Sequence, residues 1–334
     1  MNVSFEDLVE GYFITTSENL VFEVKGVVHP KDRIIAYLRY VPEESKTESH
    51  VKYRKIYDIK EREDYLKSNF PDYLWFSKVY GRVVQSVARE NIISILNPVE
   101  YLSRMRDDSR VRNDLQEATF VLARNLVQLT GISWSDIGVT GSQLLGIATE
   151  MSDIDLVIYG NTACREFYDN LFDNYNNLEG VRPYSGSSLN AHLAFRWGEL
   201  VRYHNVLGEI ESKKVLQGLF KGHEFFIRLV RRSEEIDEFY GKMQYEMIDY
   251  YRTHCVIKED TDSIFTPCVY IVEAEENTDL KRLVSYRGRF TEQVTKGMSV
   301  MAKGRLERVI DTTTGDSFQQ LVLGEDSTDY LLPI

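Results

Sequence analysis

The 334-residue chain has only three cysteines and seven prolines, and it lacks any apolar run of the roughly 18–20 residues that span a membrane. The cysteines, at positions 164, 255 and 268, lie far apart and never pair as Cys-x-x-Cys, so we expect neither a disulfide framework nor a thiolate zinc site. So few prolines exclude a long proline-rich disordered tract. The first residues lack the basic and apolar regions of a signal peptide, so we expect a cytoplasmic protein without membrane contact.

Basic residues are also in the minority, because 40 Lys+Arg face 52 Asp+Glu and the formal net charge is −12. This balance argues against a protein that grips long nucleic acids through a broad positive surface, although a local basic face remains compatible with it. The excess of acidic side chains is unevenly distributed. Residues 111–250 hold 13 basic and 20 acidic side chains, whereas residues 1–110 hold 17 basic and 18 acidic ones. A solvated acidic surface is the simplest explanation of the acidic middle segment.

Segment patterns divide the chain into three parts, in keeping with its length. Residues 1–108 predict an N-terminal α+β module of unknown role, and residues 109–252 predict a central domain in which helices and apolar strands alternate. Residues 253–334 contain short strand-like runs separated by turns, which is typical of a small β-barrel such as the OB type. The predicted fold class is therefore α+β, with a central mixed sheet between an N-terminal module and a C-terminal barrel.

Individual elements follow from the spacing of apolar residues. Runs rich in β-branched and aromatic residues predict strands at residues 12–16, 20–28, 33–40, 136–140, 156–159, 223–230, 268–272, 284–290, 298–309 and 318–323. Helical spacing predicts helices within residues 65–87, 115–129 and 233–251, and Gly131 is a stop signal for the second of these.

The most informative segment joins a glycine-containing turn to two aspartates. Gly141 and Ser142 follow an apolar strand, and after ten further residues Asp153 and Asp155 lead into another. Because side chains two apart on a strand share a face, both carboxylates project to one side while Ile154 points to the other. Paired carboxylates suit hard divalent cations, and the turn offers backbone N–H groups and a hydroxyl to phosphate oxygens. A solvated strand end is the non-functional alternative for the aspartate pair.

These residues resemble the signature of the nucleotidyltransferase superfamily of DNA polymerase β, which is Gly-[Gly/Ser], a spacer and then [Asp/Glu]-x-[Asp/Glu]. A weaker resemblance is to an archaeal group of predicted nucleotidyltransferases. The motif match covers residues 138–159, and the order of helices and strands agrees over residues 111–250. The resemblance implies transfer of a nucleoside monophosphate from an NTP to a hydroxyl group, with two Mg²⁺ or Mn²⁺ ions. It also implies that Gly141 and Ser142 contact the triphosphate and that Asp153 and Asp155 bind the metal ions.

The chain departs from the family pattern directly after the Gly-Ser pair. Many small members carry an arginine there, whereas this chain has Gln143-Leu144-Leu145. The triphosphate must then be neutralised from elsewhere, and we assign that role to Lys221 and Arg228. The other candidates are Arg196, Arg202, Lys213 and Lys214.

A third carboxylate is expected from the resemblance, on a later strand beside the aspartates. Glu224 begins a predicted strand and shares a face with Phe226 and Arg228, so we assign it as the third catalytic and metal-binding carboxylate. Glu199 and Glu209 are its competitors. The structural alternative is a strand-end glutamate paired with a surface lysine.

We therefore expect a metal-dependent nucleotidyltransferase whose acceptor is a short RNA end, such as that of a tRNA. Basic residues interleaved with Tyr286 and Phe290 in the last segment fit contact with a single strand, and they equally fit a plain solvent-facing strand. The alternatives are nucleotidylation of a protein or a small molecule, and a non-catalytic nucleotide- or RNA-binding module on the same fold.

Overall fold

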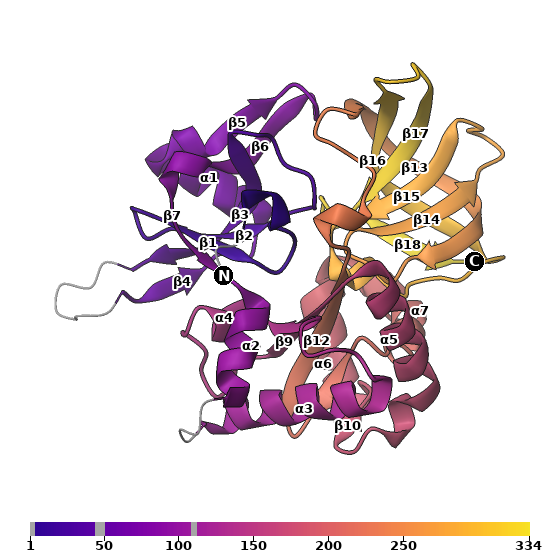
Figure 1. The fold of residues 1–334 in the computed structure, drawn as a ribbon. Helices are drawn as coiled ribbons and strands as arrows, with labels where there is room; N and C mark the ends of the chain where they lie inside the picture. Colours follow the sequence, from indigo (N-terminus) through magenta and orange to yellow (C-terminus); the bar gives the residue numbers. More distant parts are fainter. Residues whose placement is uncertain (1–3, 44–50, 108–111) are drawn as a thin grey trace.

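A computed structural model describes residues 4–43, 51–107 and 112–334, which form three groups of elements (Figure 1). These are an N-terminal antiparallel sheet, a central mixed sheet with helices, and a C-terminal sheet that closes into a ring. The α+β prediction is therefore confirmed. No helix among the described residues is long and apolar enough to cross a membrane.

The N-terminal sheet has the strand order β5-β6-β3-β2-β1-β7, and β4 pairs with β3 at one side. Its strands are β1 (Phe13–Thr16), β2 (Val21–Val24), β3 (Arg33–Pro42), β4 (Tyr53–Lys55), β5 (Leu74–Ser77), β6 (Arg82–Ala88) and β7 (Ile92–Leu96). Helix α1 (Ile59–Asn69) begins at Asp58, whose carboxylate accepts a hydrogen bond from the Glu61 N–H at 2.9 Å. The apolar face of α1 packs on the sheet through Leu66.

The helix predicted within residues 65–87 is correct only as far as Asn69. Residues 74–88 form the β5-β6 hairpin instead, with Trp75 paired to Val84 and Phe76 to Val83. Valines recurring every three or four residues fit a helix as well as a strand, and β-branched side chains favour the strand once β3 offers it a partner.

The central sheet has the order β10-β11-β12-β9-β8, in which only the β9-β12 pair is parallel. Its strands are β8 (Ile137–Val139), β9 (Ile154–Tyr159), β10 (Val181–Arg182), β11 (Gln217–Phe220) and β12 (His223–Val230). The helices before and within it are α2 (Pro98–Asp107), α3 (Asp114–Thr130), α4 (Gly141–Leu144), α5 (Asn161–Asn174), α6 (Gly186–Trp197) and α7 (His204–Glu211). The largest apolar core lies between this sheet and helices α3 and α5.

The predictions for α3 and for the three strands β8, β9 and β12 are confirmed. Helix α3 starts with a capping box between Asn113 and Gln116 and ends at Gly131, whose φ of 74° is the left-handed conformation typical of a helix end. In the parallel pair, Phe225 lies opposite Ile154 and Phe226 opposite Asp155. This register sets Glu224 beside Asp153.

The C-terminal strands are β13 (Met243–Asp262), β14 (Cys268–Glu273), β15 (Leu280–Ser285), β16 (Ser299–Asp311), β17 (Ser317–Leu323) and β18 (Tyr330–Pro333). They follow the order β13-β14-β15-β17-β16-β18, and an additional pairing of β13 with β16 closes the ring. The turn at residues 311–316 joins β16 to β17, with the Asp311 N–H donating to the Asp316 carbonyl. Short 3₁₀ segments complete the chain: η1 (Phe5–Asp7), η2 (Pro71–Tyr73), η3 (Arg89–Asn91), η4 (Tyr175–Asn177), η5 (Gly198–Tyr203), η6 (Ser233–Glu235) and η7 (Gly288–Phe290).

The helix predicted over residues 233–251 is wrong. Only η6 is helical there, and β13 begins at Met243, opposite Asp311 of β16. Pairing continues to Val256 opposite Ser299, so a long antiparallel partner overrides the helical spacing of the aromatic residues and methionines. The division predicted between residues 252 and 253 falls within β13, and the one between 108 and 109 lies outside the described residues.

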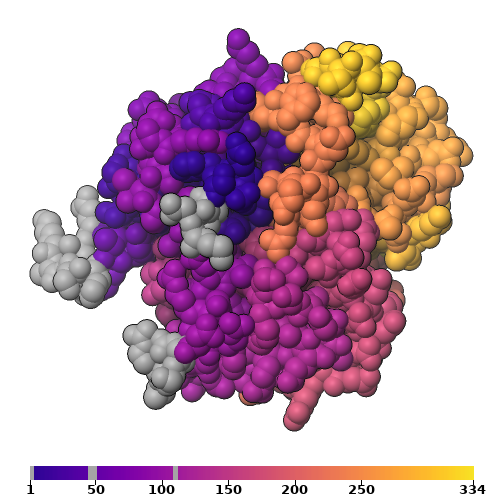
Figure 2. All heavy atoms as spheres, viewed as in Figure 1, coloured from indigo at the N-terminus to yellow at the C-terminus, as the bar shows by residue number. Residues whose placement is uncertain are grey.

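The three groups meet around a common junction (Figure 2). The N-terminal part is tied to the central sheet by two side chains: the Thr140 hydroxyl donates to the Gly11 carbonyl at 2.7 Å, and the Tyr159 hydroxyl donates to the Glu10 carbonyl at 3.0 Å. Arg228 of β12 adds ion pairs to Glu10 and Glu23. The junction is therefore a packed interface between sheets rather than a flexible tether.

Candidate functional site

The glycine turn and the aspartate strand touch each other. Gly141 opens α4 with a φ of +69°, and a Cβ atom built on it would lie 2.1 Å from Oδ2 of Asp155. The Thr140 N–H donates to the Asp155 carbonyl at 2.9 Å, which holds the two segments in register. A glycine is required here both by the backbone conformation and by the space that Asp155 occupies.

Asp153 and Asp155 flank Ile154, which is fully buried at the start of β9, so the predicted alternation of side chains is present. Asp153 lies directly before the strand. Partial desolvation and the neighbouring carboxylates of Asp155 and Glu224 raise the pKa of Asp153 to about 6. A divalent cation between such carboxylates would relieve their mutual repulsion.

Glu224 lies next to Asp153 but is engaged elsewhere. Its Oε2 accepts a hydrogen bond from the Tyr184 hydroxyl at 2.9 Å. Across the described ranges, no three His, Cys, Asp or Glu side chains converge closely enough to hold a metal ion. The oxygen donors of Asp153 and Asp155 fit the chemistry of Mg²⁺ or Mn²⁺, and the remaining ligands would come from water or a bound phosphate.

The other two acidic candidates lie away from the aspartates. Glu199 is exposed on η5, and Glu209 is exposed on α7. Neither belongs to the described residues that line the cavity containing Asp153 and Asp155.

That cavity has a volume of about 490 Å³ and is walled by all three parts of the chain. Lys25, Arg39, Lys55 and Arg62 belong to the N-terminal part, whereas Arg287 belongs to the C-terminal ring. Among the described residues, nine lysines and arginines and five carboxylates line it, so this part of the wall carries an excess of four positive charges inside a protein of net charge −12. Such a wall attracts an anionic ligand.

Arg228 and Lys221, the two cations predicted to neutralise a triphosphate, lie in different places. Arg228 lines the cavity, where its Nη1 is 2.5 Å from Oε1 of Glu23 and 3.1 Å from Oε2 of Glu10. Lys221 is exposed at the turn between β11 and β12, and the cavity wall, as far as the structure describes it, does not include it. Of the two, only Arg228 lies in the described wall of the cavity, and its role at a triphosphate stays a prediction.

Gln143 is the first of the three residues after the Gly-Ser pair, among which the arginine expected from the resemblance is missing. It is buried, and its Nε2 donates to Oγ1 of Thr119 on α3 at 2.8 Å. Its role here is to join α4 to α3, so positive charge must reach the cavity from other segments.

Four arginines supply that charge without a carboxylate partner: in the described part of the chain, Arg62, Arg196, Arg287 and Arg289 line the cavity and form no ion pair. Sequence reasoning named Arg196 only as one of several triphosphate candidates, and it missed Arg62 altogether. No sequence signal links these residues, because α1, α6 and η7 are brought together only by the tertiary fold.

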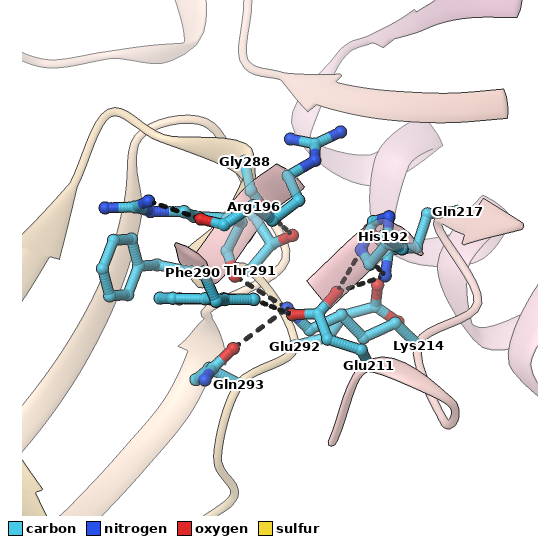
Figure 3. A network of polar contacts seen from close by, with 12 residues as sticks. His192, Arg196, Glu211, Lys214, Gln217, Gly288, Phe290, Thr291, Glu292 and Gln293 are labelled. Atoms are coloured by element: carbon cyan, nitrogen blue, oxygen red, sulfur yellow. Dashed lines mark hydrogen bonds and ion pairs between the residues drawn. The ribbon is translucent and has the colours of Figure 1, made fainter. Parts of the chain in front are cut away.

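A buried polar network holds η7 against the central part (Figure 3). The Lys214 ammonium donates to Oε1 of Glu211 at 2.8 Å, to the Arg289 carbonyl at 2.7 Å and to Oε1 of Gln293 at 2.9 Å. Arg289 in turn donates to the Arg196 carbonyl at 2.8 Å. The network therefore sets the positions of two cavity arginines, Arg196 and Arg289.

Comparison with known proteins finds a similar archaeal chain. Over 322 residues the protein is 28% identical to the uncharacterized protein MJ1086 of Methanocaldococcus jannaschii, and the alignment covers 93% of this chain and 94% of that one. No family model matches the chain, and no solved structure matches it. The likeness to the archaeal protein therefore extends through all three parts rather than being confined to the motif segment.

Proposed function

We propose that the protein is a metal-dependent nucleotidyltransferase of the DNA polymerase β type, which transfers a nucleoside monophosphate from an NTP to a hydroxyl group. The observation that carries the proposal is the contact between Gly141 and the Asp155 carboxylate. It joins the phosphate-binding turn to the aspartate pair at one point in space. The positive cavity beside them supports a polyphosphate ligand.

Different residues would bind the metal ions and the triphosphate. Asp153 and Asp155 would hold the divalent cations, which stabilise charge on the phosphoryl oxygens. Ser142 and the N–H groups at the start of α4 would contact the triphosphate, while Lys55 and Arg196, the cations acting on Asp153, would balance its charge. The acceptor oxygen bonds to the α-phosphorus as the bond to the bridging oxygen breaks, pyrophosphate leaves, and the hydroxyl proton passes to water.

The acceptor is proposed to be a short RNA end, with a protein hydroxyl or a small molecule as alternatives. A cavity enclosed by three modules favours a chain terminus over a continuous duplex. A non-catalytic nucleotide- or RNA-binding module is the second candidate. It is favoured by one observation, the hydrogen bond that engages Glu224 with Tyr184 instead of a metal-binding cluster.

Label transfer tests the catalytic proposal. The full chain is incubated with each labelled NTP, Mg²⁺ or Mn²⁺ and total RNA, and label is followed on RNA, protein and small molecules. We expect transfer from at least one NTP and a loss of about 100-fold or more in the double variant Asp153→Asn/Asp155→Asn. Asp173→Asn, at an exposed position of α5, is the matched control and should retain full activity.

Transfer that survives the double substitution contradicts the assignment of the aspartates. If no acceptor is labelled while an NTP still binds, the non-catalytic alternative replaces the enzyme. Label on protein instead of RNA would change the acceptor and leave the reaction class intact.

A further inference from the structure

Three arginines at the seam between the N-terminal part and the C-terminal ring have no role in the proposed reaction. They are Arg62 of α1, Arg287 immediately before η7, and Arg289 within η7, and we call them the arginine subsite. Arg62 is 1% exposed. Burial, together with the positive charges of nearby arginines, lowers the pKa of Arg62 and of Arg289 to about 10. Uncompensated buried charge is costly, so a compensating anion is expected from outside the protein.

The hydrogen bonds of these arginines orient them without neutralising them. Nε and Nη2 of Arg62 donate to the carbonyls of Ile56 and Tyr57, each at 3.0 Å. Nε of Arg287 donates to the Gly324 carbonyl at 3.2 Å, and Nη1 of Arg289 donates to the Arg196 carbonyl. Every one of these acceptors is a neutral backbone group. A guanidinium has five N–H donors, so each side chain keeps donors for a ligand.

The arginine subsite borders the cations beside the aspartates, because Arg289 donates to the Arg196 carbonyl and the Arg196 charge contributes to lowering the pKa of Arg289. Lys55 and Arg196 are the cations that act on Asp153, and Arg228 is the one on which Asp155 acts. The charged neighbours of Arg287 are instead Arg39, Glu23 and Glu325, which belong to the N-terminal part and the ring. The cavity thus has one group of cations at the aspartates and a second at the seam, and Arg289 lies where the two groups meet.

We propose that the arginine subsite binds a phosphate group carried by the acceptor substrate. This proposal rests on the proposed function, because the group of cations at the aspartates is then taken by the NTP. Guanidinium forks match phosphate oxygens in geometry as well as charge, and three of them around one cavity wall suit a phosphate ester. Because Arg62 and Arg287 come from the modules on either side, those modules select the acceptor while the central sheet supplies the reaction.

Binding of inorganic phosphate to the full chain tests the subsite. Isothermal titration is carried out on the free protein and again with a saturating non-hydrolysable NTP analogue and Mg²⁺. We expect phosphate to bind in both cases, and Arg287→Gln and Arg289→Gln to weaken binding by about tenfold or more. Arg287→Lys should bind with intermediate affinity and covers the case in which the glutamine variant does not fold. Arg308→Gln, at an exposed arginine of β16, should leave phosphate affinity unchanged.

The possible results separate the two proposals. Competition between phosphate and the NTP analogue would overturn the subsite, because the arginines would then hold the triphosphate. Unchanged phosphate affinity in the Arg287 variants would overturn it as well. If no NTP binds while phosphate affinity still depends on Arg287 and Arg289, the proposed function fails and the anion subsite stands.

The source of the phosphate is identified by displacement. A short 5′-phosphorylated oligonucleotide and glycerol phosphate are each titrated into the phosphate-loaded protein. Displacement by the first identifies a nucleic-acid end, and displacement by the second a small phosphate ester. Displacement by neither contradicts the proposal.

Discussion

At the scale of single residues, the site depends on a glycine that fits only because it has no side chain. Gly141 and Gly146 share a left-handed backbone, with φ of +69° and +75°, but only Gly141 faces the Asp155 carboxylate. A Cβ on Gly146 would meet nothing within 4 Å. Comparing the two glycines therefore distinguishes backbone strain from collision of a side chain with the Asp155 carboxylate.

We predict that Gly146→Ala costs about 1–2 kcal/mol of stability from backbone strain and keeps nucleotidyl transfer. Gly141→Ala should cost more and abolish transfer, because Asp155 or α4 must move to admit the methyl group. Urea unfolding and label transfer measure the two effects. Equal behaviour of the two alanine variants would contradict the geometry assigned to the turn.

A second residue-scale prediction concerns acid stability of the N-terminal part. His29 donates from Nε2 to the Leu8 carbonyl at 2.9 Å and accepts at Nδ1 from the Ile35 N–H at 3.2 Å, so its neutral form is the one that fits. Burial lowers the pKa of His29 to about 4. The unfolded chain takes up a proton below pH 6.5, whereas the folded chain does so only near pH 4.

Protonation therefore favours the unfolded state, and stability should fall by about 3 kcal/mol as the pH drops from 6.5 to 4. His29→Gln keeps one donor and one acceptor and should remove this part of the pH dependence. His254→Gln, at an exposed histidine, should not. Urea unfolding at a series of pH values is the measurement, and an unchanged slope in His29→Gln would refute the assignment.

The residues whose geometry depends on near neighbours were recognisable in the sequence. Asp153, Asp155 and Gly141 are recognisable because strand alternation and turn conformation depend on near neighbours. The placement of Glu224 beside Asp153 followed from strand register, but its hydrogen bond to Tyr184 did not. The sequence also could not show that Lys221 lies outside the described wall of the cavity, because a charge at a strand end does not reveal which face or cavity it meets.

At the scale of elements, the spacing of apolar residues distinguished helix from strand correctly where a helix also had residues that mark its two ends. Helix α3 has a capping box and a terminal glycine, and its prediction is confirmed to within one residue at each end. The segments at 74–88 and 243–251 are strands instead, and their partners, β3 and β16, lie far away in the sequence. Pairing with a distant strand outweighs local spacing because hydrogen bonds along a whole edge depend on it.

The network around Lys214 fixes one element against another. Burial alone would raise the pKa of Glu211. The Lys214 ammonium and the His192 hydrogen bond instead hold this pKa well below its usual range. Lys214→Met leaves that buried carboxylate without its cation and should cost about 3–5 kcal/mol of stability. Lys213→Met, at the exposed neighbouring position, should cost little.

Urea unfolding measures both variants, and the double variant Lys214→Met/Glu211→Gln completes a thermodynamic cycle. The double variant should lose less stability than the sum of the losses in Lys214→Met and Glu211→Gln, because no uncompensated buried charge is left in it. Additive losses would show that the two side chains do not stabilise each other. Lys214→Met should also weaken phosphate binding, since η7 then loses its anchor at the Arg289 carbonyl.

At the scale of the whole molecule, the cavity belongs to no single part of the chain. Its carboxylates come from the central sheet, and much of its positive charge comes from the N-terminal sheet and the ring. This explains how a protein of net charge −12 can contain a cavity with a positive wall. It also gives the N-terminal module, whose purpose the sequence left open, a place in the proposed reaction.

The sequence by itself determined what depends on near neighbours: the α+β class, the Gly141-Ser142 turn, the aspartate pair and the long helix α3. Only the tertiary structure decided which distant segments meet, because contacts between α1, α6 and η7 leave no mark in local spacing. The scarcity of cysteine and proline excluded several classes of protein, yet it could not show where the charges lie. Folding gathers arginines from three modules into one cavity with two aspartates, because burial and strand register act across the whole chain.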